Sequence, residues 1–156
     1  MQYILMIAVG VILFGVVGIY VWSFTAGRPS NLGVSNGQLA PVPESPNAVS
    51  TQTEQELAAM EPLVVPASCT KPIDQAAGIL RGMGASEIVT QSSDYLHAEF
   101  TSSIFRFTDD VELYFDAATR LLHFRSASRI GHSDLGVNRE RMETFSRRFG
   151  AEHSPQ

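Results

Sequence analysis

Residues 125–139 hold the densest group of side chains in this chain that could carry chemistry. Three arginines, three serines, one histidine and one aspartate occur within these fifteen residues. Arginine presents a planar set of donors that matches a carboxylate or phosphate, and serine hydroxyls add further hydrogen bonds. The composition therefore predicts recognition of an anionic group or of a protein partner. The candidate binding residues are Arg125, Ser126, Ser128, Arg129, His132, Ser133, Asp134, Asn138 and Arg139.

Alternatively, residues 125–139 form a turn whose polar side chains stabilise the fold and do not bind a ligand. In that interpretation Asp109 and Asp110 accept hydrogen bonds from Arg129 or Arg139, while Asp134 and Asn138 cap the helix that follows. The two interpretations are compatible, because one part of the segment can hold the fold while another part faces a partner.

Hydrolysis is a further alternative. His132, Asp134 and a neighbouring serine are the residue types of an acyl-transfer triad. Triad residues usually come from separate strands and loops, and residues this close on one turn seldom converge on one substrate atom. We therefore predict a binding protein rather than an enzyme and assign no catalytic residue.

The sequence contains no metal-binding motif. His97, His123 and His132 do not occur at the short spacings that join two ligands to one ion. Cys69 is the only cysteine, so no internal disulfide can form and no cluster of cysteines can hold zinc or an iron–sulfur centre. We therefore predict no metal and no cofactor.

Charge is unevenly distributed along the chain. The formal net charge of −5 argues against a general nucleic-acid binder. Residues 87–116 carry seven acids and one arginine, whereas residues 120–148 carry seven arginines and three acids. Opposite charges on neighbouring strands attract each other, so we predict pairing across a sheet, with a basic surface for a partner as the alternative. The acids assigned to structural ion pairs are Asp109, Asp110 and Glu112.

The N-terminal run at residues 3–22 is uncharged and almost wholly apolar. Twenty such residues match the thickness of a bilayer when helical, and no basic residue precedes them as in a cleaved signal peptide. We expect an uncleaved transmembrane anchor within residues 1–27, which contacts the lipid bilayer through residues 3–22. Arg28 is the only cation near the run, so charge hardly determines the orientation.

The remaining chain is long enough for one small domain. Residues 28–61 are rich in proline, serine and asparagine and predict an extended arm, which could also drape over the domain surface. A globular domain is expected over residues 62–150, beginning with an extended segment at Leu63-Val64-Val65, with a tail at 151–156.

The periodicity within the domain predicts an α+β fold. Apolar residues at helical spacing indicate helices over 72–83 and from about 138 to 149. Runs rich in β-branched and aromatic residues indicate strands at 87–91, 95–101, 105–115 and 122–129. We expect an antiparallel meander of about four strands, with two helices on one face and the other face open.

Alternation along these strands also predicts a register. If Asp116 faces Leu121, then Glu112 lies opposite Arg125 and the two form an ion pair. The open face would carry Tyr95, His97, Glu99, Glu112, Tyr114, His123 and Arg125.

Residues 125–139, together with 95–102 and 105–112, resemble the family catalogued as domain of unknown function 1499. The resemblance covers roughly residues 29–149 and includes Asn31-Leu-Gly-Val and Ser45-Pro-Asn-Ala-Val-Ser-Thr in the arm. Members of that family often carry two cysteines where this chain has Val42 and Ala48, which implies that a disulfide is lost here. The resemblance implies an envelope or plastid protein and no assigned activity.

We therefore expect an accessory or binding protein of the bacterial cell envelope. The expected location is the inner membrane, in a single-pass arrangement with a periplasmic domain. The expected partner is a membrane or envelope protein and not a nucleic acid, and the oligomeric state is open. The alternative is a small envelope hydrolase that uses His132, Asp134 and a serine.

Overall fold

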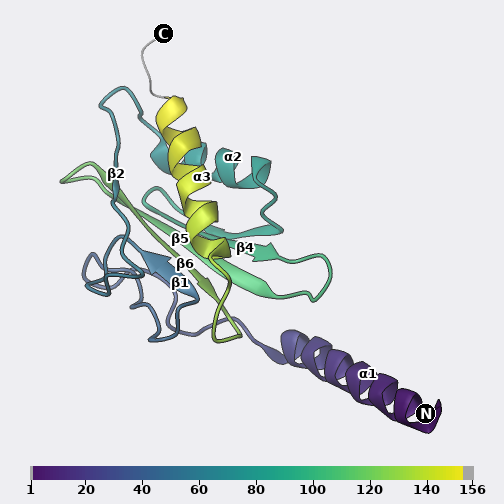
Figure 1. The fold of residues 1–156 in the computed structure, drawn as a ribbon. Helices are drawn as coiled ribbons and strands as arrows, with labels where there is room; N and C mark the ends of the chain where they lie inside the picture. Colours follow the sequence, from purple (N-terminus) through teal and green to yellow (C-terminus); the bar gives the residue numbers. More distant parts are fainter. Residues whose placement is uncertain (1, 153–156) are drawn as a thin grey trace.

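The computed structural model describes residues 2–152 of the chain, so the last four residues of the expected tail lie outside the described part. The described residues form an α+β fold, as predicted, in which α2 and α3 lie on one face of an antiparallel sheet (Figure 1). The helices are α1 (Gln2–Thr25), α2 (Pro72–Gly82) and α3 (Val137–Ala151). The strands are β1 (Ala48–Ser50), β2 (Leu63–Val64), β3 (Glu87–Gln91), β4 (Tyr95–Thr101), β5 (Thr108–Asp116) and β6 (Leu121–Ser128).

The sheet has six strands, and the expected number of about four is therefore wrong. Four of them, β3 to β6, form the predicted meander, and β1 and β2 both pair with β6. These two additional strands contain three and two residues, which is too short for an alternating pattern to appear in a sequence. They exist because the long strand β6 offers them hydrogen-bonding partners.

The predicted register is confirmed. Asp116 pairs with Leu121, and Glu112 pairs with Arg125 across β5 and β6. Because successive side chains of a strand point to opposite faces, Val111 and Leu113 of β5 and Leu122 and Phe124 of β6 all join the core on the helix side of the sheet.

The core lies between the sheet and the two helices. It is built from one stripe of each helix and from the inward-facing residues of β4 to β6. Burial of each large apolar side chain contributes roughly 1.5–3 kcal/mol to folding. The fully buried contributors include Ile73 and Leu80 of α2, Met142, Phe145 and Phe149 of α3, and Leu96, Leu113, Leu122 and Phe124 of the sheet.

The N-terminal apolar run forms the helix α1, which extends away from the sheet in Figure 1. Among the residues that the structure describes, however, no helix combines the length and apolarity needed to cross a membrane. The expected transmembrane helix over residues 3–22 is therefore wrong. An uncharged apolar run favours local helix formation, but helix formation alone does not establish a membrane crossing.

The arm covers the sheet face that we expected to be open. Arg28 reaches Glu99 on β4, and the backbone N–H of Gly33 donates to Glu112 on β5, with a distance of 2.7 Å. Farther along the arm, β1 forms an edge of the sheet by pairing with β6. As a result, His97 and Glu112 on this face are almost completely buried.

One amide, that of Asn138 in α3, connects the arm, the sheet and the last helix. Its side chain is fully buried. The amide nitrogen donates to the Asn47 carbonyl oxygen and to Ser128 Oγ, both at 3.0 Å, and the amide oxygen accepts from Ser126 and Arg141. The backbone N–H of Ser128 also donates to the Asn47 carbonyl oxygen.

Replacement of Asn138 by alanine should lower the free energy of unfolding by about 2 kcal/mol or more, because several buried polar groups would lose their partner. Urea denaturation followed by circular dichroism measures this change. Asn31→Ala, at an exposed position of the arm, is the matched control and should change stability by less than about 0.5 kcal/mol. Equal stability of the two variants would contradict this role for Asn138.

Candidate binding site

Several charged side chains lie beneath the arm. We call Glu99, Asp110, Glu112, Arg125 and Arg129 the charged cluster. Arg129 follows β6 and donates from Nε to Asp110 Oδ2 at 2.8 Å and from a terminal nitrogen to Asp110 Oδ1 at 2.7 Å. The same nitrogen contacts Glu99, which also accepts from Arg28 of the arm. One guanidinium thus joins β4, β5 and the end of β6.

The second half of the charged cluster is centred on Glu112. Its carboxylate accepts hydrogen bonds from Tyr95 Oη at 2.8 Å and from Arg125 at 3.2 Å, in addition to the Gly33 N–H. The pKa of Tyr95 is raised by burial and by the nearby Glu112 charge. Arg125 is buried and forms an ion pair with Glu112. Its Nε has no hydrogen-bond partner among the described residues.

The arginines keep the buried carboxylates ionised. Burial alone would raise the pKa of Asp110, but hydrogen bonds from Arg129 and His97 outweigh burial and hold the pKa below its usual value. For Glu99, burial is likewise outweighed by Arg129 and Arg28, and the pKa is again lowered. The pKa of Arg129 is raised by the same contacts, chiefly that with Asp110.

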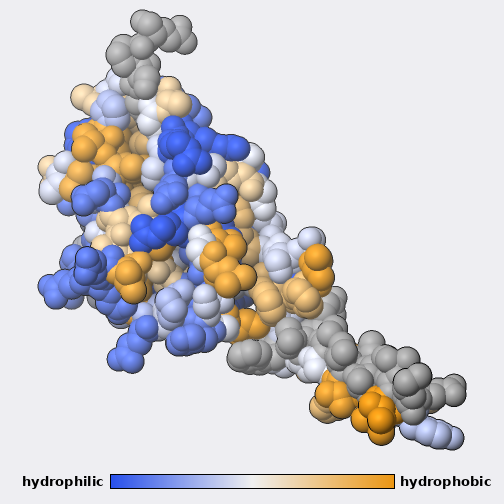
Figure 2. Space-filling view, viewed as in Figure 1, coloured by the Kyte–Doolittle hydropathy of each residue, from blue (hydrophilic) through white to orange (hydrophobic). Residues whose placement is uncertain are grey.

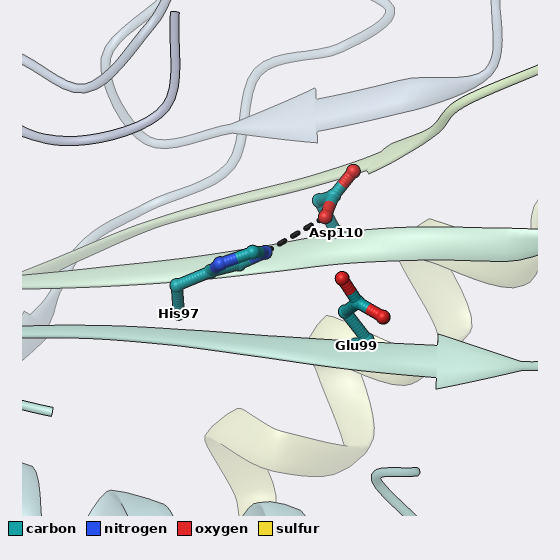
Figure 3. A group of neighbouring side chains, drawn as sticks. All are labelled: His97, Glu99 and Asp110. Atoms are coloured by element: carbon teal, nitrogen blue, oxygen red, sulfur yellow. Dashed lines mark hydrogen bonds and ion pairs between the residues drawn. The ribbon is translucent and has the colours of Figure 1, made fainter. Parts of the chain in front are cut away.

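His97, Glu99 and Asp110 have the residue types of a metal site (Figure 3). One ligand atom from each lies within 4.8 Å of the others, and His97 Nε2 is 2.7 Å from Asp110 Oδ1. The Arg129 guanidinium, however, already contacts both carboxylates. The geometry therefore supports a buried ion-pair network in which an arginine supplies the positive charge.

All three acids that were assigned to structural ion pairs are paired, but the partner of Asp109 differs from the predicted Arg129 or Arg139. Asp110 pairs with Arg129, and Glu112 pairs with Arg125, as described above. Asp109 points to the helix side, where it pairs with Arg141 at 2.7 Å and accepts from Ser128. Arg141 also lies over the Phe100 ring, 4.6 Å from its centroid.

Most polar residues of the 125–139 segment make internal contacts. Asp134 accepts from the backbone N–H groups of Gly136 and Asn138 and thereby caps α3, as predicted. The prediction that Asn138 is a second cap is wrong, because Asn138 lies within α3 and its amide oxygen accepts from Ser126 and Arg141. Arg139 donates to the carbonyl oxygens of Leu57 and Ala59 instead of to an aspartate. Ser126 and Ser128 join the Asn138 network described above.

His132 and Ser133 are exposed on the turn before α3. Ser133 Oγ accepts from the Leu135 backbone N–H, and Asp134 is used as the helix cap. Among the described residues, no hydrogen bond joins His132 to Asp134 or to a serine. His97 and His123 lie on the sheet, where His123 is near Thr51 and stacks on Tyr114, and neither forms a group with His132.

An open hollow of about 510 Å³ lies beside the start of α3. We call it the α3 groove. It runs between the β4–β5 loop and the turn before α3, and Asp109 and Arg141 contribute to its floor. Figure 2 shows apolar surface at the tip of that loop and near the start of α3, among hydrophilic side chains. The apolar lining consists of Phe100, Phe107, Ile130 and Val137, and the nearby exposed apolar residues are Ile104, Phe105 and Leu135.

A family model described as a protein of unknown function (DUF1499) matches residues 38–149, which is more than half of the chain. The chain belongs to the DUF1499 family. The resemblance noted from the sequence is therefore confirmed. No curated protein and no solved structure gives a significant match.

The DUF1499 match begins within the arm and includes β1. The matched region therefore contains part of the arm, which covers one face of the sheet, as well as the helices that cover the other face. It also includes the whole charged cluster and the whole α3 groove, whereas Arg28, which contacts Glu99 from the arm, lies before the match. Both features therefore belong to the DUF1499 region of this chain.

The apolar lining of the α3 groove has no distinct signature in the DUF1499 sequence. Phe100 and Phe107 lie in or beside strands, where aromatic residues ordinarily indicate core. The available signal was Ile104 in the predicted loop at residues 102–104, because a large apolar residue at a loop tip is not needed for core packing. Phe105 was predicted to begin a strand, but β5 begins only at Thr108.

Arg129→Lys should lower the free energy of unfolding by about 3 kcal/mol, because an ammonium cannot donate simultaneously along the directions of the guanidinium fork. Arg147→Lys, at an exposed position of α3, is the control and should have little effect. Chemical denaturation measures both values. Unchanged stability of Arg129→Lys would show that the charged cluster does not depend on the guanidinium geometry.

Acid should destabilise the protein through the same cluster. The folded-state pKa values of Asp110 and Glu99 are lowered. Their contribution to the free energy of unfolding is therefore complete above the unfolded-state pKa values of about 4. It is lost as the pH falls through the lowered folded values. Urea midpoints measured from pH 7 to pH 2 should show this decline, and Asp110→Asn should reduce its slope. Identical slopes in the two proteins would contradict the assignment.

Proposed function

We propose that this DUF1499 protein is a non-catalytic binding protein that holds an apolar ligand group in the α3 groove. The single observation that carries the proposal is the groove itself, an open hollow of about 510 Å³ lined by Phe100, Phe107, Ile130 and Val137. Its volume falls within the range of about 300–1,000 Å³ that is typical of small-molecule sites.

The composition of the groove also supports this function. Small-molecule sites are mostly apolar, with a small number of positioned polar groups. In the α3 groove the polar groups are held by one another, because Arg141 pairs with Asp109 and also donates to Asn138 Oδ1. A paired floor of this kind attracts neither a strongly acidic nor a strongly basic ligand, so contact with the apolar walls would dominate binding.

The proposal assigns two roles to residues 125–139. Arg125 and Arg129 hold the end of β6 in the charged cluster. The following turn, from Ile130 to Val137, supplies one wall of the groove. We thus propose that the turn contacts the ligand and that Arg125 and Arg129 do not. This differs from the prediction made from the sequence, in which these arginines bind an anionic group directly.

Hydrolysis receives no support from this geometry, because Asp134 is engaged as a helix cap and His132 points to no described serine or carboxylate partner. The proposal also keeps an accessory role in the bacterial cell envelope, with a periplasmic domain and an envelope protein as partner. This part of the proposal is supported by the family resemblance alone.

Val137→Asp should weaken binding of monolaurin, a neutral lauroyl ester, by at least about tenfold, because a carboxylate would be placed against the acyl chain. Val137 is half exposed at the first residue of α3, where an acid interacts favourably with the helix dipole, so the fold should be retained. Isothermal titration calorimetry below the critical micelle concentration measures the affinity.

Leu135→Asp is the matched control, since Leu135 is 94% exposed and does not line the groove. It introduces the same charge two residues away and should bind monolaurin like the unmodified protein. The proposed function fails if the unmodified protein does not bind monolaurin, or if both variants lose binding equally while their melting temperatures are unchanged.

A further inference from the structure

A second hollow of about 330 Å³ lies next to the α3 groove, farther along α3. The two hollows share Phe100, Val137 and Arg141 in their walls, so they adjoin each other at these side chains. The second hollow also reaches Thr144 and Arg148, toward the end of the helix. A ligand chain that fills the first hollow can therefore extend into the second.

One stripe of α3 faces the two adjoining hollows. Val137, Arg141, Thr144 and Arg148 are separated by four, three and four residues, which places them on the same side of an α-helix. From Val137 to Arg148 the stripe is roughly 16 Å long, at 1.5 Å per residue. The stripe begins with an apolar side chain and ends with a cation.

Arg148 differs from Arg141 in its partners. Arg141 is paired with Asp109, whereas Arg148 makes no ion pair among the described residues and donates to the carbonyl oxygen of Gly82 at 3.2 Å. Arg148 is also exposed. Its remaining donors can therefore reach a ligand in the second hollow.

Glu140 also lines the second hollow and limits which anion fits there. It lies eight residues before Arg148, roughly 12 Å along the helix axis. A single negative charge bound at Arg148 is far enough from the Glu140 carboxylate to be repelled only weakly. A larger or doubly charged head group would be repelled by Glu140 more strongly. The charges favour a compact monoanion at the Arg148 end.

We propose that the joined hollows bind a fatty-acid-type ligand, with its acyl chain along the apolar walls and its carboxylate at Arg148. This inference rests on the proposed function, because it needs the α3 groove to take the chain. It adds the chemical class of the ligand and the direction in which the ligand lies. The carboxylate accepts charge-assisted hydrogen bonds from the Arg148 guanidinium.

Comparison of laurate with monolaurin tests this inference, since the two carry the same chain and differ in head-group charge. At pH 8 the full-length protein should bind laurate about fivefold more tightly than monolaurin. Arg148→Gln should abolish this preference and leave monolaurin binding unchanged. Arg147→Gln removes the same charge from the neighbouring exposed position, which does not line the hollow, and should retain the preference.

The outcomes separate the two proposals. Equal affinities for laurate and monolaurin, or a laurate preference that survives Arg148→Gln, would overturn the head-group assignment and leave the groove as a binding site. Tighter binding of dodecylamine than of laurate would overturn it as well. Failure of both lauroyl ligands to bind would remove the proposed function together with this inference.

Discussion

The carboxylates of Asp110 and Glu112, which are buried, and of Glu99, which is partly buried, impose the constraint on which the rest of the structure depends. An unpaired charge in such a position costs on the order of several kcal/mol, so each needs a cation held in place. Arg125 and Arg129 provide these cations from β6 and the residue that follows it, and Arg28 adds a third from the arm. The pairing of β5 with β6 and the path of the arm are therefore coupled to one electrostatic requirement.

This coupling explains which parts of the fold could be read from the sequence. The Glu112–Arg125 register could be predicted, because alternation in two long strands leaves few alternatives. Strand β1 could not, since its three residues are too few to show a pattern, whereas β2 lies within the segment Leu63-Val64-Val65 that was predicted to be extended. Coverage of the sheet by the arm was predicted only as an alternative to free extension, because the contact of Gly33 with Glu112 uses a backbone N–H that every residue except proline possesses. The apolar run at residues 3–22 indicated a helix correctly and a transmembrane segment wrongly.

The candidate site was predicted in part for a related reason. Residue types identified 125–139 as unusual, and the segment does lie beside a groove, but its polar side chains mostly bind one another. Composition cannot distinguish an arginine that faces a ligand from one that faces a buried carboxylate. The apolar walls come from a loop and a turn that are far apart in sequence, so their approach depends on the whole sheet.

The hydrogen bond between Asn47 and Asn138 spans 91 residues, and β1 pairs with a strand that ends at Ser128. Such contacts form late, because a long loop must close before they stabilise the chain. During synthesis the arm therefore leaves the ribosome well before β6 and α3 exist to receive it. The arm is made before the domain, yet its order depends on synthesis of the chain through β6 and the start of α3.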